Sequence, residues 1–298
     1  MTRLSAPGSP SAAGVAADRL RGVARIDLPR RARPMVFGVV NVTPDSFSDG
    51  GDHATAEAAL EFAKRLAADG ADALDVGGES TRPGAKPVPA DVEAARVVPV
   101  VRGLRAAGIA LPVSVDTRKA SVAYAALEAG ATLVNDVSAG TADPAMLATA
   151  ARHGAGIVLM HMRGDPETMQ QAPVYRDVVE EVLAYLVARA EAARAAGVPP
   201  ERIWIDPGIG FGKTFAHNEA LMAALERFAA TGLPVLVGAS RKGFLGGITG
   251  RPPKERLAAS LACAARAFEA RAAGVRVHDV RETVDLLDTL ARVSPLRG

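Results

Sequence analysis

Polar side chains stand at the ends of eight short apolar runs in this sequence. The runs lie far apart along the chain, yet each turns polar at its C-terminal end. Any one of these residues could simply mark the start of a loop. Eight runs that all end in functional side chains predict one shared site. These side chains are Asn41, Thr43, Glu79, Ser80, Thr81, Arg82, Asp116, Asn135, His161, Arg163, Asp206, Ser240, Arg241, Lys242, Arg276 and His278.

The residue types at these ends suit two kinds of chemistry. The carboxylates of Asp116 and Asp206 and the amide of Asn135 can bind the N–H groups on the edge of a flat heterocycle. Cationic side chains are suited to phosphates or a carboxylate. The predicted cations are Arg82, Arg241, Lys242, Arg276 and His278. Together they predict a substrate with a donor-rich ring at one end and anionic oxygens at the other.

The elements that must position these residues alternate between two patterns. Segments with apolar spacing of three and four separate the runs, which is typical of helices. Many of these segments end in glycine, where we expect left-handed helix caps: Gly70, Gly108, Gly130, Gly154, Gly197, Gly232 and Gly274. The eight predicted strands are residues 35–43, 73–79, 112–117, 132–138, 156–162, 203–208, 234–240 and 275–279.

Eight strand and helix units in about 260 residues predict an α/β protein with a (β/α)₈ TIM barrel in a single domain. The strands are short and apolar, as in a parallel sheet buried on both faces. Active sites of this fold lie at the C-terminal ends of the strands, where the polar residues stand. A doubly wound open sheet is the alternative fold, although it more usually carries a glycine fingerprint after its first strand.

The stretch RIWIDPGIGFGK, residues 202–213, resembles a phosphate-binding glycine loop, since Gly208, Gly210 and Gly212 follow an apolar run. Asp206 stands at its head, and a carboxylate there would repel phosphate. The glycine pattern alone is therefore a weak indication of a nucleotide site.

Composition limits the partners of this 298-residue chain. Its net charge of +2 gives no reason to expect nucleic acid, and no apolar run is long enough for a membrane span. The single cysteine, Cys263, fits a reducing cytoplasm. Residues 1–33 are rich in Ala, Pro, Ser and Arg, so we predict a loosely ordered extension there and the barrel domain over residues 34–298.

Eight motifs in order resemble those of the dihydropteroate synthase family, which consists of pterin-binding TIM barrels. The resemblance extends from about residue 35 to residue 293 and leaves only the N-terminal extension outside it. The motifs are NVTPDSFSDGG (41–51), VGGESTRPGA (76–85), SVDT (114–117), NDVSAG (135–140), HMRGDPETMQ (161–170), DPGIGFGKT (206–214), GASRKGFLG (238–246) and RVHDV (276–280).

The resemblance implies an enzyme of folate synthesis. Such an enzyme condenses 6-hydroxymethyl-7,8-dihydropterin diphosphate with 4-aminobenzoate, through loss of diphosphate from the pterin methylene. It implies that Asp116, Asn135, Asp206 and Lys242 bind the pterin. It further implies that Asp116, Asp206, Lys242 and Arg276 are catalytic.

The same resemblance assigns the rest of the site. The diphosphate would lie near Asn41, Thr81, Arg276 and His278, with Mg²⁺ bridging its oxygens and the amide of Asn41. The 4-aminobenzoate pocket would be formed by Phe47, Arg82, Pro83, Phe211, Ser240 and Arg241. It also implies that sulfonamides compete with 4-aminobenzoate, and that the chain forms a homodimer through the helices near 254–274 and 281–293.

Three other functions stay open at this point. A pterin-dependent methyltransferase would share the aspartate and asparagine site, but would not need the STRPG and SRK segments. A Schiff-base aldolase would use a lysine within a strand, whereas Lys242 follows its strand. A catalytically silent paralogue would keep the binding residues and act as a binding protein.

Overall fold

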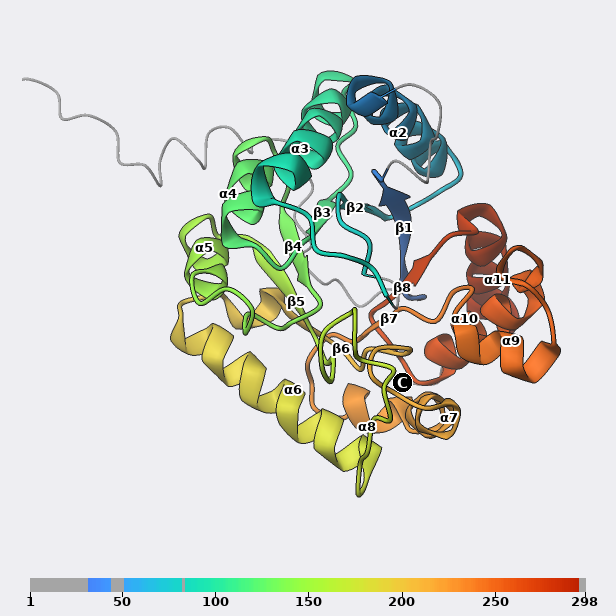
Figure 1. Ribbon diagram of the computed structural model, residues 1–298. Coiled ribbons are helices and arrows are strands. Elements are labelled where there is room, and N and C mark those ends of the chain that lie inside the picture. The colour runs from blue at the N-terminus through green and yellow to red at the C-terminus, as the bar shows by residue number, and fades with distance from the viewer. Residues whose placement is uncertain (1–31, 44–50, 82–83, 295–298) are drawn as a thin grey trace, which may run out of the picture.

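The computed structural model describes residues 32–43, 51–81 and 84–294. These residues form eight strands with helices between them, and Figure 1 shows the helices arranged around the strands. All of the predicted extension except its last two residues lies outside the described ranges.

The eight strands pair in parallel in a single sheet with the order β6-β5-β4-β3-β2-β1-β8-β7. The two edge strands meet as well, since Ile205 bridges Val235 and its N–H donates to the Pro234 carbonyl at 2.9 Å. The predicted barrel is therefore confirmed, and the open sheet is wrong. The strands are β1 Met35–Asn41, β2 Ala73–Gly77, β3 Val113–Asp116, β4 Leu133–Asp136, β5 Gly156–Met160, β6 Ile203–Asp206, β7 Leu236–Val237 and β8 Gly274–Val277.

Helices follow every strand and cover the outside of the barrel. Their bounds are α2 Gly51–Ala68, α3 Ala90–Ala106, α4 Ala120–Glu128, α5 Met146–Arg152, α6 Val178–Ala195, α7 Phe215–Ala223, α8 Leu225–Ala229, α9 Gly243–Thr249, α10 Leu257–Glu269 and α11 Val280–Val293. Two helices follow β6 and two follow β7, which is one more in each place than the ideal repeat requires.

Local sequence explains where several helices begin and end. Asp177 caps α6, because its carboxylate accepts the N–H groups of Val179 and Glu180 at 2.9 and 3.1 Å. The predicted left-handed glycines have positive φ angles at all positions except Gly274. That residue instead begins β8, and Arg271, with φ of 58°, holds the left-handed position after α10.

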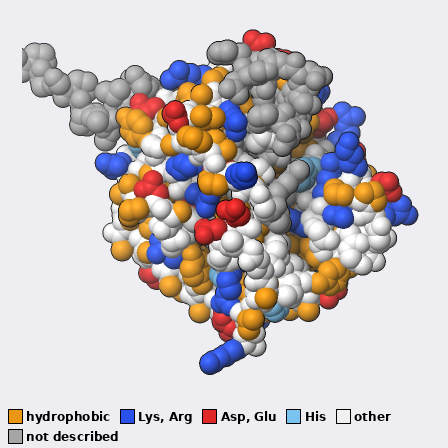
Figure 2. All heavy atoms as spheres, viewed as in Figure 1, with side chains coloured by type: hydrophobic (Ala, Val, Ile, Leu, Met, Phe, Trp, Pro, Cys, Tyr) orange, Lys and Arg blue, Asp and Glu red, His pale blue; other side chains and the backbone are white. Residues whose placement is uncertain are grey.

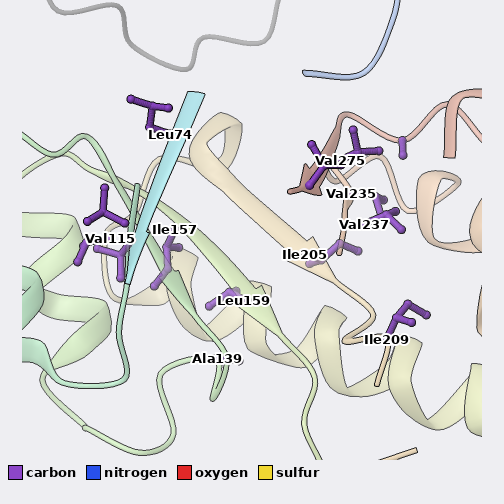
Figure 3. Packing of buried hydrophobic residues seen from close by; sticks show 14 of the residues in the cluster. Leu74, Val115, Ala139, Ile157, Leu159, Ile205, Ile209, Val235, Val237 and Val275 are labelled. Carbon is purple, nitrogen blue, oxygen red and sulfur yellow. The ribbon is translucent and has the colours of Figure 1, made fainter. Parts of the chain in front are cut away.

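The two faces of each strand have separate roles. One face packs against the helices, as Val115, Ile157, Ile205 and Val275 do in Figure 3. The other face points into the barrel. At its lower level it forms an apolar floor of Met35, Phe37, Ala73, Leu133, Val158, Trp204 and Leu236.

Polar side chains lie one pleat above this floor. Leu133 is followed two residues later by Asn135, Trp204 by Asp206, and Ala73 by Asp75. Because side chains two apart on a strand share a face, these polar groups lie inside the barrel toward the C-terminal ends of the strands.

The start of the described chain is fixed to the barrel by charge. Arg33 donates to the carboxylate of Asp72 at 2.6 Å and also to that of Asp288. This last residue of the predicted extension therefore contacts the barrel, while the domain boundary itself stays a prediction.

Charges of both signs are interspersed on the face shown in Figure 2, which agrees with the small net charge. Among the described residues, no helix is both long and apolar enough to cross a membrane.

We expect replacement of Trp204 by Ala to lower the free energy of unfolding by about 4 kcal/mol, because the side chain is fully buried in the barrel floor. Its ring packs edge to face on Phe37, with centroids 5.7 Å apart. Urea unfolding followed by circular dichroism measures this change, since the variant lacks the chain's one tryptophan. The matched control is Ile248→Ala at a 58% exposed position, and equal loss in both variants would contradict the prediction.

Candidate active site

A pocket opens at the C-terminal ends of the strands, above the apolar floor. The space between its walls and out to its open mouth is about 330 Å³. Its lining combines polar groups with an apolar wall. The lining residues are Thr81, Asp116, Asn135, Val137, Met160, Asp206, Ile209, Phe211, Gly238, Lys242 and Arg276.

Arg276 on β8 lies at the centre of a buried charge network. Its Nε donates to Asp75 Oδ2 at 2.6 Å, and a terminal nitrogen donates to Asp116 Oδ2 at 2.9 Å. The Asn135 amide donates to the same oxygen of Asp75 at 3.1 Å. Strands β2, β3, β4 and β8 are therefore joined by polar contacts inside the barrel.

Burial changes the pKa of groups in this network. Burial opposes the charge on Arg276, but the carboxylates of Asp75 and Asp116 more than offset that effect and raise its pKa. Burial also raises the pKa of Asp116, which Arg276 partly opposes. Arg276 is therefore a permanent cation placed between carboxylates.

Asp206 ends β6 and is only 4% exposed. Its Oδ1 accepts the Gly208 N–H at 2.7 Å, so the carboxylate is oriented by its own loop. Burial raises the pKa of Asp206 to about 6, while the Gly208 N–H, Lys242 and Lys213 oppose this rise. At neutral pH the group is mainly a carboxylate that can accept N–H groups from a ligand.

The glycines of this loop permit close contact between two stretches of main chain. A Cβ on Gly208 would lie 1.9 Å from the His161 carbonyl oxygen, and one on Gly212 would lie 2.3 Å from that of Arg163. They allow the loop after β6 to pack main chain against the loop after β5. Only Gly210 faces a pocket residue, since its Cβ would meet Lys242 Cδ at 3.2 Å.

The loop after β7 supplies Lys242, whose Nζ lies 4.0 Å from the centre of the Phe211 ring. This cation–π contact joins the loops that follow β6 and β7 across the pocket. A cation and an aromatic face therefore lie together in the pocket that Asp206 also lines.

The neighbouring Ser240 and His278 bind each other. The Ser240 hydroxyl accepts the His278 backbone N–H at 3.2 Å and lies 3.1 Å from His278 Nδ1, to which it can donate. Burial lowers the pKa of His278 to about 4, and Arg276 and Arg241 lower it further. His278 is therefore neutral at pH 7, so its prediction as a cation is wrong.

Arg241 pairs with Asp279, with Nε donating to Oδ2 at 3.0 Å. Its backbone has a φ of 58°, and its N–H donates to Ser260 Oγ at 3.0 Å. The side chain is thus directed to an ion pair, and Arg241 does not line the pocket.

The structure brings seven of the eleven predicted site residues that it describes into one pocket. Thr81, Asp116, Asn135, Asp206, Phe211, Lys242 and Arg276 line it. Asn41, Ser240, Arg241 and His278 lie at the ends of β1, β7 and β8 without lining it. Phe47, Arg82 and Pro83 lie outside the described residues.

Sequence reasoning left two buried charged residues without a role in the site. Asp75 holds Arg276 and Asn135 and is 1% exposed. A carboxylate within an otherwise apolar strand is the signal that could have identified it, because such a group requires a partner. The other is Lys213, which ends the glycine loop and is 2% exposed.

No group of three His, Cys, Asp or Glu residues in the described part of the chain could hold a metal ion. Cys263 is a free thiol whose pKa is raised by burial to about 11, so it is not an activated nucleophile. The polar groups that line the pocket include carboxylates, an amide and two cations.

Comparison with known proteins identifies the family. A family model described as "Pterin binding enzyme" matches residues 37–278. Dihydropteroate synthase from Mycobacterium leprae is 52% identical over 259 residues, which is 85% of this chain and 90% of that protein. The Escherichia coli K12 enzyme is 44% identical over 256 residues, covering 86% and 90% of the two chains.

Solved structures agree with these sequence relatives. Dihydropteroate synthase from Xanthomonas albilineans, solved with 4-aminobenzoic acid, has a TM-score of 0.83 and 50% identity, and covers 89% of this chain and 94% of its own. The same enzyme in complex with 7,8-dihydropteroate has a TM-score of 0.80 and 47% identity, with 89% and 95% covered. This chain therefore belongs to the dihydropteroate synthase family of pterin-binding enzymes.

Proposed function

We propose that this pocket joins 6-hydroxymethyl-7,8-dihydropterin diphosphate to 4-aminobenzoate, with 7,8-dihydropteroate and diphosphate as products. The observation that carries the proposal is the pocket lining itself. Asp116, Asn135 and Asp206 supply acceptors and an amide for a heterocycle, while Lys242 and Arg276 supply cations beside them. A ring that carries an anionic leaving group requires both sets.

The pterin ring is placed on the carboxylate side of the pocket. Asp206 accepts the N–H groups on one edge of the ring, because its Oδ1 is already oriented by Gly208. Asn135 and Asp116 bind the rest of that edge from β4 and β3. The apolar side chains of Met160 and Val137 form a wall for the ring faces.

Because 4-aminobenzoate is a weak nucleophile, its attack requires that the pterin methylene first becomes a strong electrophile. Diphosphate leaves first, and the arylamine then captures the pterin methylene cation. The carboxylates of Asp116 and Asp206 provide negative potential beside that cation. Arg276, which binds Asp116, stabilises the negative charge of the departing group, and neutral His278 does so by donating a hydrogen bond.

Mg²⁺ binding is part of the proposal, with the diphosphate supplying most of the ligands. Mg²⁺ prefers oxygen ligands and usually binds through substrate phosphates, so a carboxylate cage is not required. Asn41 fits this role, since it ends β1 on the same face as Phe37 and presents an amide oxygen at the pocket end of the barrel. When bound, the ion neutralises charge on the leaving group.

The 4-aminobenzoate is placed beside Phe211 and Lys242, where the aromatic and cationic contacts lie. Ser240 and Arg241 follow the same strand, β7, and their part in binding the carboxylate stays a prediction, as does competition by sulfonamides. Relatives crystallised with 4-aminobenzoic acid and with 7,8-dihydropteroate support this reaction over methyl transfer. An assay of diphosphate release and dihydropteroate formation distinguishes this reaction from a catalytically silent paralogue.

We expect Asp206→Asn to lower kcat/KM for the pterin diphosphate by about 100-fold, because one acceptor becomes an amide N–H donor that faces the donors of the ring. Diphosphate release and dihydropteroate formation are measured with and without 4-aminobenzoate. The control, Asp91→Asn on the exposed surface of α3, should retain wild-type rates. Pterin binding without release in the wild-type chain would instead identify a silent paralogue.

Removal of Mg²⁺ with a chelator should abolish diphosphate release, and added Mg²⁺ should restore it. In Asn41→Ala, we expect the Mg²⁺ concentration for half-maximal rate to rise about tenfold, because one oxygen ligand is lost. The KM for 4-aminobenzoate should change little. An unchanged Mg²⁺ requirement in this variant would remove Asn41 from the proposed site.

A homodimer through the last helices, α10 and α11, and a cytoplasmic location complete the proposal. We expect light scattering at micromolar concentration to give twice the chain mass of 30.7 kDa. A monomer mass under these conditions would contradict the dimer.

A further inference from the structure

Lys213 is a buried cation that the proposed reaction does not use. Its Nζ donates to His161 Nδ1 at 3.0 Å, to the His161 carbonyl at 3.1 Å and to the Phe211 carbonyl at 3.0 Å. An ammonium group has three protons, and three acceptors surround it here. All three are neutral, and none of the ion pairs among the described residues includes Lys213.

These contacts hold together two loops at the mouth of the barrel. One follows β5 and begins at His161, and the other follows β6 and extends from Asp206 to Lys213. The main chains touch where Gly208 and Gly212 leave no room for a Cβ. Polar side chains join the loops further along: Gln170 Nε2 donates to the Gly210 carbonyl at 2.7 Å, and the Tyr175 hydroxyl donates to that of Gly212 at 2.8 Å.

The loop held by Lys213 carries three residues of the pocket, Asp206, Ile209 and Phe211, and the first and last of them are assigned one to each substrate. Asp206 stands at its start and lies on the pterin side. Phe211 lies near its end and accepts a hydrogen bond from Lys213 through its carbonyl, while its ring faces Lys242. A movement of the loop would displace both groups, although Lys213 itself does not line the pocket.

We propose that Lys213 is a positioning residue. Its ammonium group holds the loop from Asp206 to Phe211 against the end of β5 and positions the Phe211 ring for 4-aminobenzoate. This inference rests on the proposed function, and it assigns a role that the pocket lining alone does not show.

The charged groups around Lys213 support this assignment. Four charged or titratable groups interact electrostatically with Lys213. They are His161 and Arg163 from the end of β5, Asp206 from β6 and Lys242 from the loop after β7. Burial lowers the pKa of Lys213 to about 7, and Asp206 opposes that effect. Burial also lowers the pKa of His161 to about 3, with Lys213 and Arg163 adding to the effect and Glu181 on α6 opposing it. His161 is therefore neutral, and its Nδ1 can accept a hydrogen bond from Lys213.

The direction in which Lys213 shifts the pKa of Asp206 follows from these charges. Lys213, Lys242 and Arg276 all favour its carboxylate over its acid form. Loss of the positive charge of Lys213 therefore raises the pKa of Asp206, so protonation begins at a higher pH. Near pH 6, where Asp206 titrates, Lys213 is itself mainly charged.

Lys213→Met tests the proposal, because methionine fills a similar space without charge or N–H donors. We expect KM for 4-aminobenzoate to rise about tenfold, which corresponds to the loss of one charged hydrogen bond. The acid limb of kcat/KM for the pterin diphosphate should move to higher pH by about one unit. The control is Lys64→Met, a lysine on α2 that pairs with Glu61 and should leave both values unchanged.

A second pair of variants tests the acceptor. His161→Asn places a carbonyl oxygen where Nδ1 stands, whereas His161→Leu removes the acceptor, and both lose the ring contacts with Tyr175 and Tyr185. The asparagine variant should retain a KM for 4-aminobenzoate near that of wild type, and the leucine variant should resemble Lys213→Met. If Lys213→Met does not fold, this pair decides the result.

Thermal unfolding separates positioning from a purely structural role. A lower melting temperature with unchanged KM and an unchanged acid limb would overturn the proposal, as would equal behaviour of the two His161 variants. If the wild-type chain forms no dihydropteroate, the proposed function fails. The pH dependence of pterin diphosphate binding, measured by calorimetry, then gives the same comparison between wild type and Lys213→Met.

Discussion

The buried pairing of Arg276 with Asp75 and Asp116 is the interaction on which the site depends. A guanidinium and carboxylates inside a barrel are costly to bury unless each is paired and hydrogen-bonded. Here β2, β3 and β8 each supply one of the charges, and Asn135 from β4 joins the network through Asp75. The strand order β4-β3-β2-β1-β8 brings the four side chains together inside the barrel.

The side chains inside the barrel form two levels with different roles, an apolar level that stabilises the fold and a polar level that forms the site. Apolar residues such as Leu133 and Trp204 fill the lower level of the barrel, and the residues two positions later, Asn135 and Asp206, form the polar level above. The floor excludes water beneath the charged groups and strengthens their interactions with a ligand. The same low dielectric raises the pKa of Asp206 to about 6, so neighbouring cations are needed to keep it charged.

The loops after β5 and β6 bind each other and position pocket residues beyond the ends of the strands. Their glycines permit contact between main chains, and Lys213 satisfies carbonyls that this contact buries. The glycine loop at residues 206–213, which resembles a phosphate-binding loop in sequence, instead positions the Asp206 carboxylate and the Phe211 ring. Lys242, which follows β7, contacts that ring from the other side of the pocket.

The sequence by itself determined the eight strands, the barrel and most residues of the pocket, because short apolar runs and polar strand ends are local patterns. Motif resemblance assigned their roles. Only the tertiary structure decided the charge states and partners: His278 is neutral because it is buried beside Arg276, and Arg241 pairs with Asp279. Asp75 and Lys213 gain their roles from groups far along the chain, and such distances in space are not encoded by spacing in sequence.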